Sequence, residues 1–147
     1  TVHTSVQQAS STLEIVGNVY GSGIDNSAIT TVNFTVALAP GGTPVDFSTV
    51  VLTYSNSTIL TTLNQTSGNY PVTSVSTGHW GVTEIDNDVG TGNKLLEAGE
   101  QFQIAAIPPY SIYPNDKFII EVKPAVGAAF VITHSAPGGL NKVNLLY

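Results

Sequence analysis

Three asparagines stand in the N-x-S/T triplet to which oligosaccharides are attached in secreted proteins. The triplets are Asn33-Phe-Thr, Asn56-Ser-Thr and Asn64-Gln-Thr. A chain this rich in serine and threonine also produces such triplets by chance, so modification and coincidence both stay open. Asn56 and Asn64 stand beside expected turns, where a modifying enzyme has the best access. The pattern predicts N-glycosylation within this set of three sites.

Carboxylates and amides gather in the polar segment 86–94, where they could coordinate a hard divalent cation. Carboxylates occupy positions one, three and twelve of a calcium-loop spacing: Asp86, Asp88 and Glu97. The match then fails, because Gly90 offers no side-chain oxygen at position five and Thr91 replaces the glycine needed at position six. A looser oxygen cage from Asp86, Asp88 and Asn93 is a candidate site for a structural Ca²⁺ or another divalent metal. The alternative is a solvated acidic loop.

Histidine and serine chemistry finds little support in the sequence. The three histidines are His3, His79 and His134, and no two of them have the spacing of a metal-ligand pair such as H-x-x-x-H. His134 shares a strand face with Phe130 and Ile132, so we expect it to be partly buried and hydrogen-bonded. There is no G-x-S-x-G motif, although a Ser-His-Asp grouping could still meet in the folded chain. We therefore expect a protein that is not an enzyme and that requires no cofactor.

The charge balance limits the partners of the chain. Its 147 residues suit one domain, and its four lysines and ten carboxylates give a net charge of −6. Four lysines without any arginine are too few to neutralise nucleic-acid phosphates or to bind an anionic membrane surface. Serine, threonine, asparagine and glycine must cover the surface instead, which indicates an extracellular protein. Cysteine is absent, so no disulfide supports the fold.

Alternation of apolar and polar residues predicts β-strands along most of the chain. In the segment 29–38, for example, Val32, Phe34 and Val36 fall on one face and polar residues fall on the other. We expect about eight strands, bounded by Gly, Pro, Asn and Asp. They span residues 13–21, 29–38, 48–56, 57–64, 79–86, 100–107, 117–123 and 128–135. Short strands at this spacing predict an all-β fold, an antiparallel immunoglobulin-like β-sandwich.

The last strands carry more apolar residues than one buried face requires. Ile119 shares a face with Glu121 and Lys123, although the opposite face of that strand is already apolar. The segments 126–132 and 140–147 are similarly apolar. Either these strands are buried on both faces, or the additional residues contact other subunits, because exposed apolar patches mark interaction surfaces. Under the second reading the candidate contacts are Ile119, Val126, Phe130 and Leu145.

Three segments, in their order along the chain, resemble the archaellins, which are the archaeal flagellins. The most specific is FIIEVKPAVGAAFVITHSAP at 118–137, with the Ile-Glu-Val-Lys-Pro run, small-residue turn and second apolar strand of the archaellin C-terminal signature. ALAPGGTPVDFSTVVLTYSN at 37–56 and LLEAGEQFQI at 95–104 are similar to two further stretches of that family. The resemblance covers residues 13–147.

The resemblance implies a structural subunit of the archaellum filament, used for swimming, that assembles helically with identical or sibling archaellins outside the cell. In that family an apolar N-terminal helix forms the filament core and a β-domain its outer surface. Residues 1–12 would then be the junction to such a helix, and residues 13–147 the outer domain. The chain has no methionine, and we expect Thr1 to follow a segment that was removed or omitted. Archaellins are commonly N-glycosylated and some bind a metal, which supports both candidate sites above.

Two other interpretations stay open. An accessory stator β-sandwich of the same machine would bind the surface layer, but we would not expect it to carry the Ile-Glu-Val-Lys-Pro segment. A secreted adhesin or carbohydrate-binding module would expose aromatic residues for stacking on sugars. The aromatic candidates for that role are Trp80, Tyr110 and Tyr113.

Overall fold

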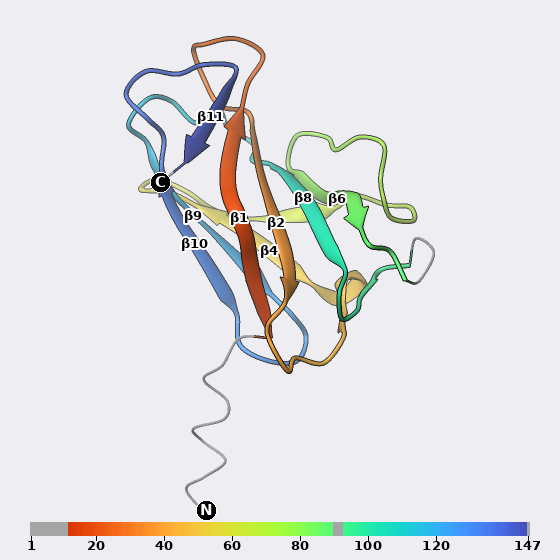
Figure 1. Cartoon of the computed structure of the whole chain (residues 1–147). Coiled ribbons are helices and arrows are strands. Elements are labelled where there is room, and N and C mark those ends of the chain that lie inside the picture. The colour runs from red at the N-terminus through yellow and green to blue at the C-terminus, as the bar shows by residue number, and fades with distance from the viewer. Residues whose placement is uncertain (1–11, 90–92, 147) are drawn as a thin grey trace, which may run out of the picture.

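The computed structural model describes residues 12–89 and 93–146, which form strands and one short 3₁₀ helix, η1 (Figure 1). The elements are β1 (Leu13–Ser22), β2 (Thr31–Leu38), β3 (Val45–Asp46), η1 (Phe47–Thr49), β4 (Val51–Ser55), β5 (Leu60–Gln65), β6 (His79–Asp86), β7 (Leu95–Leu96), β8 (Gln101–Ile107), β9 (Lys117–Lys123), β10 (Phe130–Ser135) and β11 (Val143–Leu146). Every strand expected from the alternation is present, so the all-β prediction is confirmed. The alternation does not predict β11 or the two-residue strands β3 and β7. Most of the predicted junction at 1–12 lies outside the described residues.

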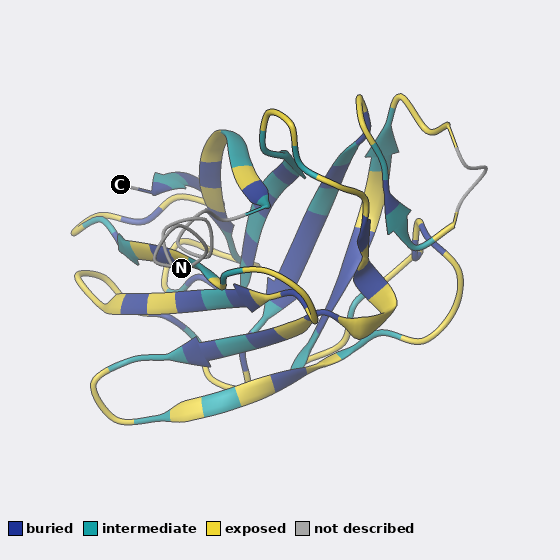
Figure 2. Cartoon of the chain, turned by 90° about the horizontal axis from the view of Figure 1, so that it is seen from below, coloured by how far each residue is buried: buried dark blue, intermediate teal, exposed yellow. Residues whose placement is uncertain are grey.

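The strands form two layers that enclose the core (Figures 1 and 2). Their hydrogen-bonded order is β10-β9-β4-β5-β6-β8-β2-β1-β11. The strands β5, β4, β9 and β10 make one layer, and the remaining five make the other. The pairing is antiparallel except between β5 and β6, where Asn64 pairs with His79 and Gln65 pairs with Trp80. This parallel pair joins the layers along one side of the sandwich, which we call the closed side. On the opposite, open side, β10 and β1 do not pair.

One face of each long strand lies in the core, as the alternation requires (Figure 2). The buried side chains of β2 and β9 are Val32, Phe34, Val36, Phe118, Ile120 and Val122. Burying a side chain of this kind contributes about 1.5–3 kcal/mol relative to leaving it in water. The apolar face of each strand therefore sets which side of the sheet points inward, and the register follows from it.

An aromatic cluster fills the core near the closed side. The centroid of the Phe47 ring lies 5.0 Å from that of Phe102 and 6.3 Å from that of Trp80, both in edge-to-face geometry. Tyr70 packs edge-on against Phe102 at 5.8 Å. Burial raises the pKa of the Tyr70 hydroxyl, so this ring stays neutral at physiological pH. The four rings come from η1, a loop and two strands, so the cluster ties the closed side together.

The strand β1 is irregular in its middle, and this determines the shape of the open side. The register between β1 and β2 shifts between Val16 and Tyr20, and Gly17 adopts a φ of 72° that side chains disfavour. The partner strand β11 pairs only with residues 19–22 of β1. The first half of β1 therefore has a hydrogen-bonded neighbour on one edge only, namely β2.

Candidate assembly face

The outward side of β9 combines charge with one apolar residue. Phe118, Ile120 and Val122 point into the core, whereas Ile119 is 38% exposed. Ile119 lies between Lys117 on one side and the Glu121 and Lys123 pair on the other along the strand. The strand is therefore buried on one face only, and Ile119 is available for contact with another molecule.

The neighbouring strands extend this apolar surface. In the sheet register Ile119 lies opposite Ser55 of β4 and Thr133 of β10. The outward valines of these two strands, Val51 and Val131, are 45% and 53% exposed. We define the β9 face as the outward side chains of β4, β9 and β10: Val51, Thr53, Ser55, Lys117, Ile119, Glu121, Lys123, Val131, Thr133 and Ser135.

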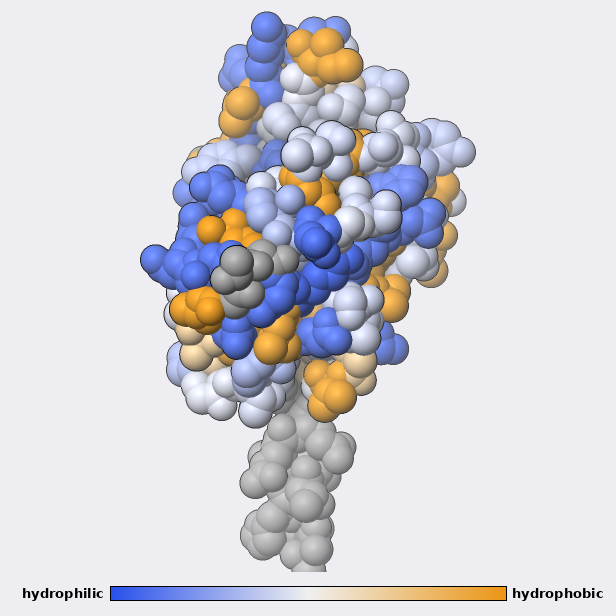
Figure 3. Space-filling model, turned by 90° about the vertical axis from the view of Figure 1, so that its right-hand side faces the viewer, coloured by the Kyte–Doolittle hydropathy of each residue, from blue (hydrophilic) through white to orange (hydrophobic). Residues whose placement is uncertain are grey.

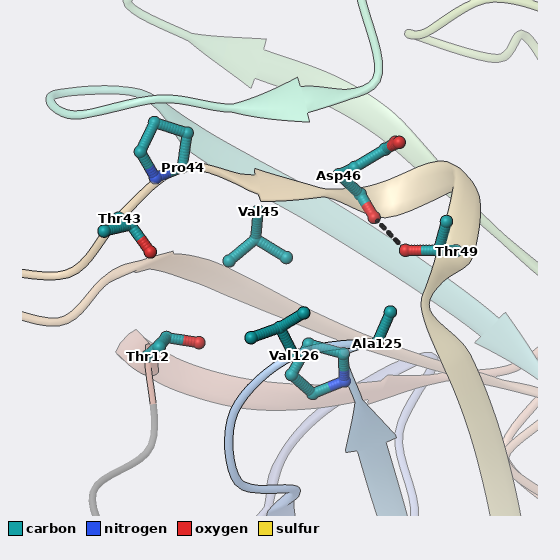
Figure 4. A pocket seen from close by; sticks show the side chains of 9 residues that line it. Thr12, Thr43, Pro44, Val45, Asp46, Thr49, Ala125 and Val126 are labelled. Carbon is teal, nitrogen blue, oxygen red and sulfur yellow. Dashed lines mark hydrogen bonds between the residues drawn. The ribbon is translucent and has the colours of Figure 1, made fainter. Parts of the chain in front are cut away.

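Val126, the second predicted contact, lies away from the β9 face. It is 84% exposed in the turn between β9 and β10, at the end of the molecule where β1 begins. With Val45, Pro44 and Thr12 it lines a shallow hollow of about 330 Å³ (Figure 4). This end of the sandwich therefore presents a second, smaller apolar surface.

The other two predicted contacts are less exposed. Phe130 is half-buried and packs against the core from the inner side of β10. Leu145 is half-buried on β11, where it pairs with Tyr20 of β1. The structure thus does not bring the four predicted contacts into one patch. Only Ile119 belongs to the β9 face.

The three predicted glycosylation sites differ in accessibility. Asn64 is exposed on the outward side of β5. The side-chain oxygen of Asn56 accepts hydrogen bonds of 2.9 Å from the backbone N–H groups of Thr58 and Ile59, so this residue folds the β4–β5 turn. Asn33 is half-buried on β2, and its amide nitrogen donates to the Ser22 hydroxyl at 3.2 Å. Asn64 therefore offers the most accessible side-chain amide.

The side chains of Asp86 and Asn93, two of the three candidate metal ligands, are each hydrogen-bonded to a different part of the chain. The Asp86 carboxylate accepts a hydrogen bond from the Gln103 amide at 3.3 Å, and the Asn93 oxygen accepts one from the Leu95 N–H at 3.0 Å. Residues 90–92, between Asp88 and Asn93, lie outside the described part of the chain. Within the described part, no three histidine, cysteine, aspartate or glutamate side chains are placed to hold a metal ion.

Glu100, for which the sequence predicted no role, holds the backbone at Val89 and Glu97 in place through its side chain. It is 1% exposed. Its carboxylate oxygens accept backbone N–H groups from Val89 at 2.9 Å and from Glu97 at 2.8 Å. A buried carboxylate requires such donors, because an unpaired charge in the core is costly. The sequence signal is the Leu-Glu-Ala-Gly-Glu turn before β8, in which Gly99 has a φ of 87°.

The structure excludes one aromatic candidate for sugar stacking and corrects one part of the expectation for His134. Trp80 is fully buried, so it cannot stack on a sugar, whereas Tyr110 and Tyr113 are exposed. His134 is half-buried as expected, but its Nδ1 atom is buried without a hydrogen-bond partner in the described chain. Both differences arise because burial depends on how the two layers pack together, which the residue pattern of a single strand does not show.

The described residues also include no helix with the length and hydropathy needed to traverse a bilayer.

The fold defines the class of this chain as a β-sandwich domain, and apolar side chains are exposed on the outer face of one of its sheets. Residues 1–134 match the family described as archaeal-type flagellin. The chain is 32% identical over 161 residues to "Probable flagellin 1" of Archaeoglobus fulgidus, an alignment that covers 99% of this chain and 75% of that protein. The chain therefore belongs to the archaeal-type flagellin family, a family of structural rather than catalytic proteins, and it is a structural subunit of the archaellum filament.

Two solved structures share its fold. The crystal structure of archaeal flagellin FlaB1 from Methanocaldococcus jannaschii has a TM-score of 0.74 at 17% identity, covering 93% of this chain and 97% of that one. The archaeal flagellum of Methanospirillum hungatei strain JF1 has a TM-score of 0.66 at 22% identity, covering 99% of this chain and 76% of that one. The predicted β-sandwich is thus confirmed by its likeness to known folds.

Proposed function

We propose that this chain assembles with identical or sibling archaeal-type flagellins into a helical filament outside the cell, without any catalytic step. The observation that carries the proposal is the β9 face, where Val51, Ile119 and Val131 stay in water. Apolar residues grouped on a sheet face favour contact with a partner. A contact between two different faces of identical subunits, repeated without closure, builds a filament.

In this assembly the end of the domain that carries Val126 and the closed side of the sandwich have different surroundings. The end with Val126 and the adjoining hollow faces the filament interior, because apolar surface is best covered there. The closed side faces the medium. Figure 3 shows that side, on which hydrophilic side chains predominate and apolar ones form small separate groups. A surface of this kind stays soluble in a filament that is bathed in water.

Immunogold electron microscopy of the producing cells tests the proposal. Antibodies raised against this chain should label filaments along their length. Label confined to the cell envelope would contradict a filament subunit and favour the stator interpretation. A strain without the gene is the control for antibody specificity, and its swimming radius on soft agar reports the contribution to motility.

We also propose that the exposed sequons carry glycans, with Asn64 modified more completely than Asn56 or Asn33. The intact mass of protein isolated from filaments should fall by one glycan in an Asn64→Gln variant. The Asn33→Gln variant is the matched control, because the Asn33 amide is half-buried and hydrogen-bonded. An unchanged mass for Asn64→Gln would overturn the assignment.

The acidic loop is proposed as a divalent-cation site formed by Asp86, Asp88 and Asn93. Ca²⁺ accepts irregular cages of carboxylate, amide and backbone oxygens. Added Ca²⁺ should raise the melting temperature of the wild-type chain and should have no effect on a double Asp86→Asn, Asp88→Asn variant. An equal shift in both proteins would show that the cation acts elsewhere.

A further inference from the structure

The lysines of this chain are unevenly distributed, which gives the two layers opposite character. Of the four lysines in the chain, Lys117 and Lys123 point outward from β9. Within the described residues neither of their ammonium groups has a hydrogen-bond or ion-pair partner. The other two lie elsewhere: the Lys94 Nζ donates to the Gln65 side chain at 3.0 Å. Lys142 lies near the Asp25 carboxylate, whose pKa is lowered mainly by hydrogen bonds from Ser27 and only to a smaller extent by this lysine.

The opposite layer carries the complementary charge. We define the β2 face as the outward side chains of β1, β2, β8 and β6. Its charged members are Glu14, Glu84 and Asp86. None of the four lysines lies on it, so its formal charge without a bound cation is −3. The β9 face, with two lysines and Glu121, has a formal charge of +1.

The uncharged residues of the two faces also differ, in polarity and in shape. The β9 face adds exposed Val51, Ile119 and Val131. The centre of the β2 face is polar and hollowed by about 160 Å³, in a depression lined by residues that include Tyr20, Asn33, Thr35, Thr83 and Gln103. One face therefore offers exposed apolar and cationic groups, and the other offers a polar hollow on a sheet face that also carries three carboxylates.

We propose that the β9 face of one copy of this chain packs on the β2 face of a second copy. The inference rests on the proposed filament function and names the surfaces that meet. Opposite charge brings the two faces together and opposes pairing of like faces. The contact joins two different surfaces. An assembly of any length therefore keeps a free β9 face at one end and a free β2 face at the other, and growth continues without closure.

The contact has a consequence for glycosylation. Asn33 lies on the β2 face, on the outward side of β2, whereas Asn64 lies on the outward side of β5, at the border of the β9 face and two strands away from Ile119. A glycan on Asn33 would occupy the space of the incoming β9 face. Subunits in a filament should therefore carry no glycan at Asn33.

Cysteine cross-linking tests the contact directly, because the natural chain has no cysteine. The double variant Ile119→Cys, Gln103→Cys, made in the full gene product and incorporated into filaments, should give a ladder of dimers, trimers and longer species on mild oxidation. Each single-cysteine variant should stay monomeric. Ile24→Cys combined with Gln103→Cys is the matched control, because Ile24 is 86% exposed but lies on neither face. A ladder in that control, or dimers of Ile119→Cys alone as abundant as the ladder, would overturn the proposal.

Charge reversal gives a second, independent readout. Lys117→Glu with Lys123→Glu should lower the yield of the ladder roughly tenfold, because both reversed charges would repel the carboxylates of the β2 face instead of attracting them. Adding Glu14→Lys and Glu84→Lys should restore it. The ladder should also weaken at high salt, where screening shortens the reach of the charges. Filaments that contain the chain but give no ladder would refute this contact and leave the proposed function intact, whereas filaments without the chain would refute the function itself.

Discussion

The closed side and the open side of the sandwich are built in different ways. On the closed side the parallel pair β5–β6 joins the layers. Behind it the rings of Trp80 and Phe102 lie with their centroids 6.3 and 5.0 Å from that of Phe47. On the open side a hollow of about 340 Å³ separates β1 from β10 and is lined by residues that include Ile15, Val131 and His134. Continuous hydrogen bonding and ring packing hold one side, and half-buried side chains line the other.

This difference predicts where the fold is sensitive to substitution. Truncation within a fully packed cluster leaves a cavity, whereas truncation at a half-exposed site leaves space that water can fill. A domain whose stability comes mainly from one side can keep its other surfaces free for contact with neighbours. Four substitutions would test that comparison, in order of decreasing effect.

Truncation of the central ring of the closed side should have the largest effect. Trp80→Ala should lower the free energy of unfolding by about 3–5 kcal/mol, because Trp80 is fully buried against Phe47. The matched change on the open side is Ile15→Ala, which should cost about 1 kcal/mol. Urea denaturation followed by circular dichroism measures both. Equal losses would show that the two sides contribute alike.

Substitution of the buried Glu100 carboxylate should have the second-largest effect on the free energy of unfolding. Glu100→Gln replaces an oxygen that accepts a backbone N–H by an amide that donates, so one of the Val89 and Glu97 N–H groups loses its acceptor. The expected loss is about 1–3 kcal/mol. Glu84→Gln, at an exposed carboxylate on β6, is the control and should change stability by less than about 0.5 kcal/mol. Protection of the Val89 amide against hydrogen exchange should fall only in Glu100→Gln.

The Lys94 ammonium group over the Tyr70 ring should make a modest contribution to the stability of the fold. The Lys94 Nζ lies 4.9 Å from the centre of the Tyr70 ring and donates to Gln65. Lys94→Met keeps the aliphatic stem and removes the charge, and should cost about 0.5–1 kcal/mol. Lys123→Met, on the exposed β9 face, should leave the unfolding midpoint in urea unchanged. A larger loss for Lys123→Met would place stabilising contacts on that face.

The smallest effect is expected at the open side. His134→Leu removes an imidazole whose Nδ1 has no hydrogen-bond partner in the described chain. Removing this Nδ1 atom forfeits no hydrogen bond within the described chain, so stability should stay within about 0.5 kcal/mol of wild type or rise slightly. Thermal unfolding of both proteins measures the difference. A clear loss would mean that the imidazole packs more tightly than the half-buried hollow indicates.

Much of the fold could be predicted from local patterns. Alternation in β2 and β9 identifies the inward residues, because successive side chains of a strand point to opposite faces. The same rule identifies Ile119 as an outward residue between charged ones. Whether Ile119 is exposed or buried was left open by the sequence, and the structure shows that it is exposed. The Ile-Glu-Val-Lys-Pro segment likewise identifies the family before any coordinates are known.

Other features depend on residues that are distant in the sequence. The alternation does not show that Phe130 packs against the core or that Trp80 joins an aromatic cluster, because both depend on which strand lies across the core. The role of Glu100 depends on the path of the loop that returns over it. Strand periodicity is a local property, whereas burial and charge on a face result from how the layers meet. The sequence by itself thus determined the strands, their inward residues and the family, and only the tertiary structure decided which faces carry opposite charge.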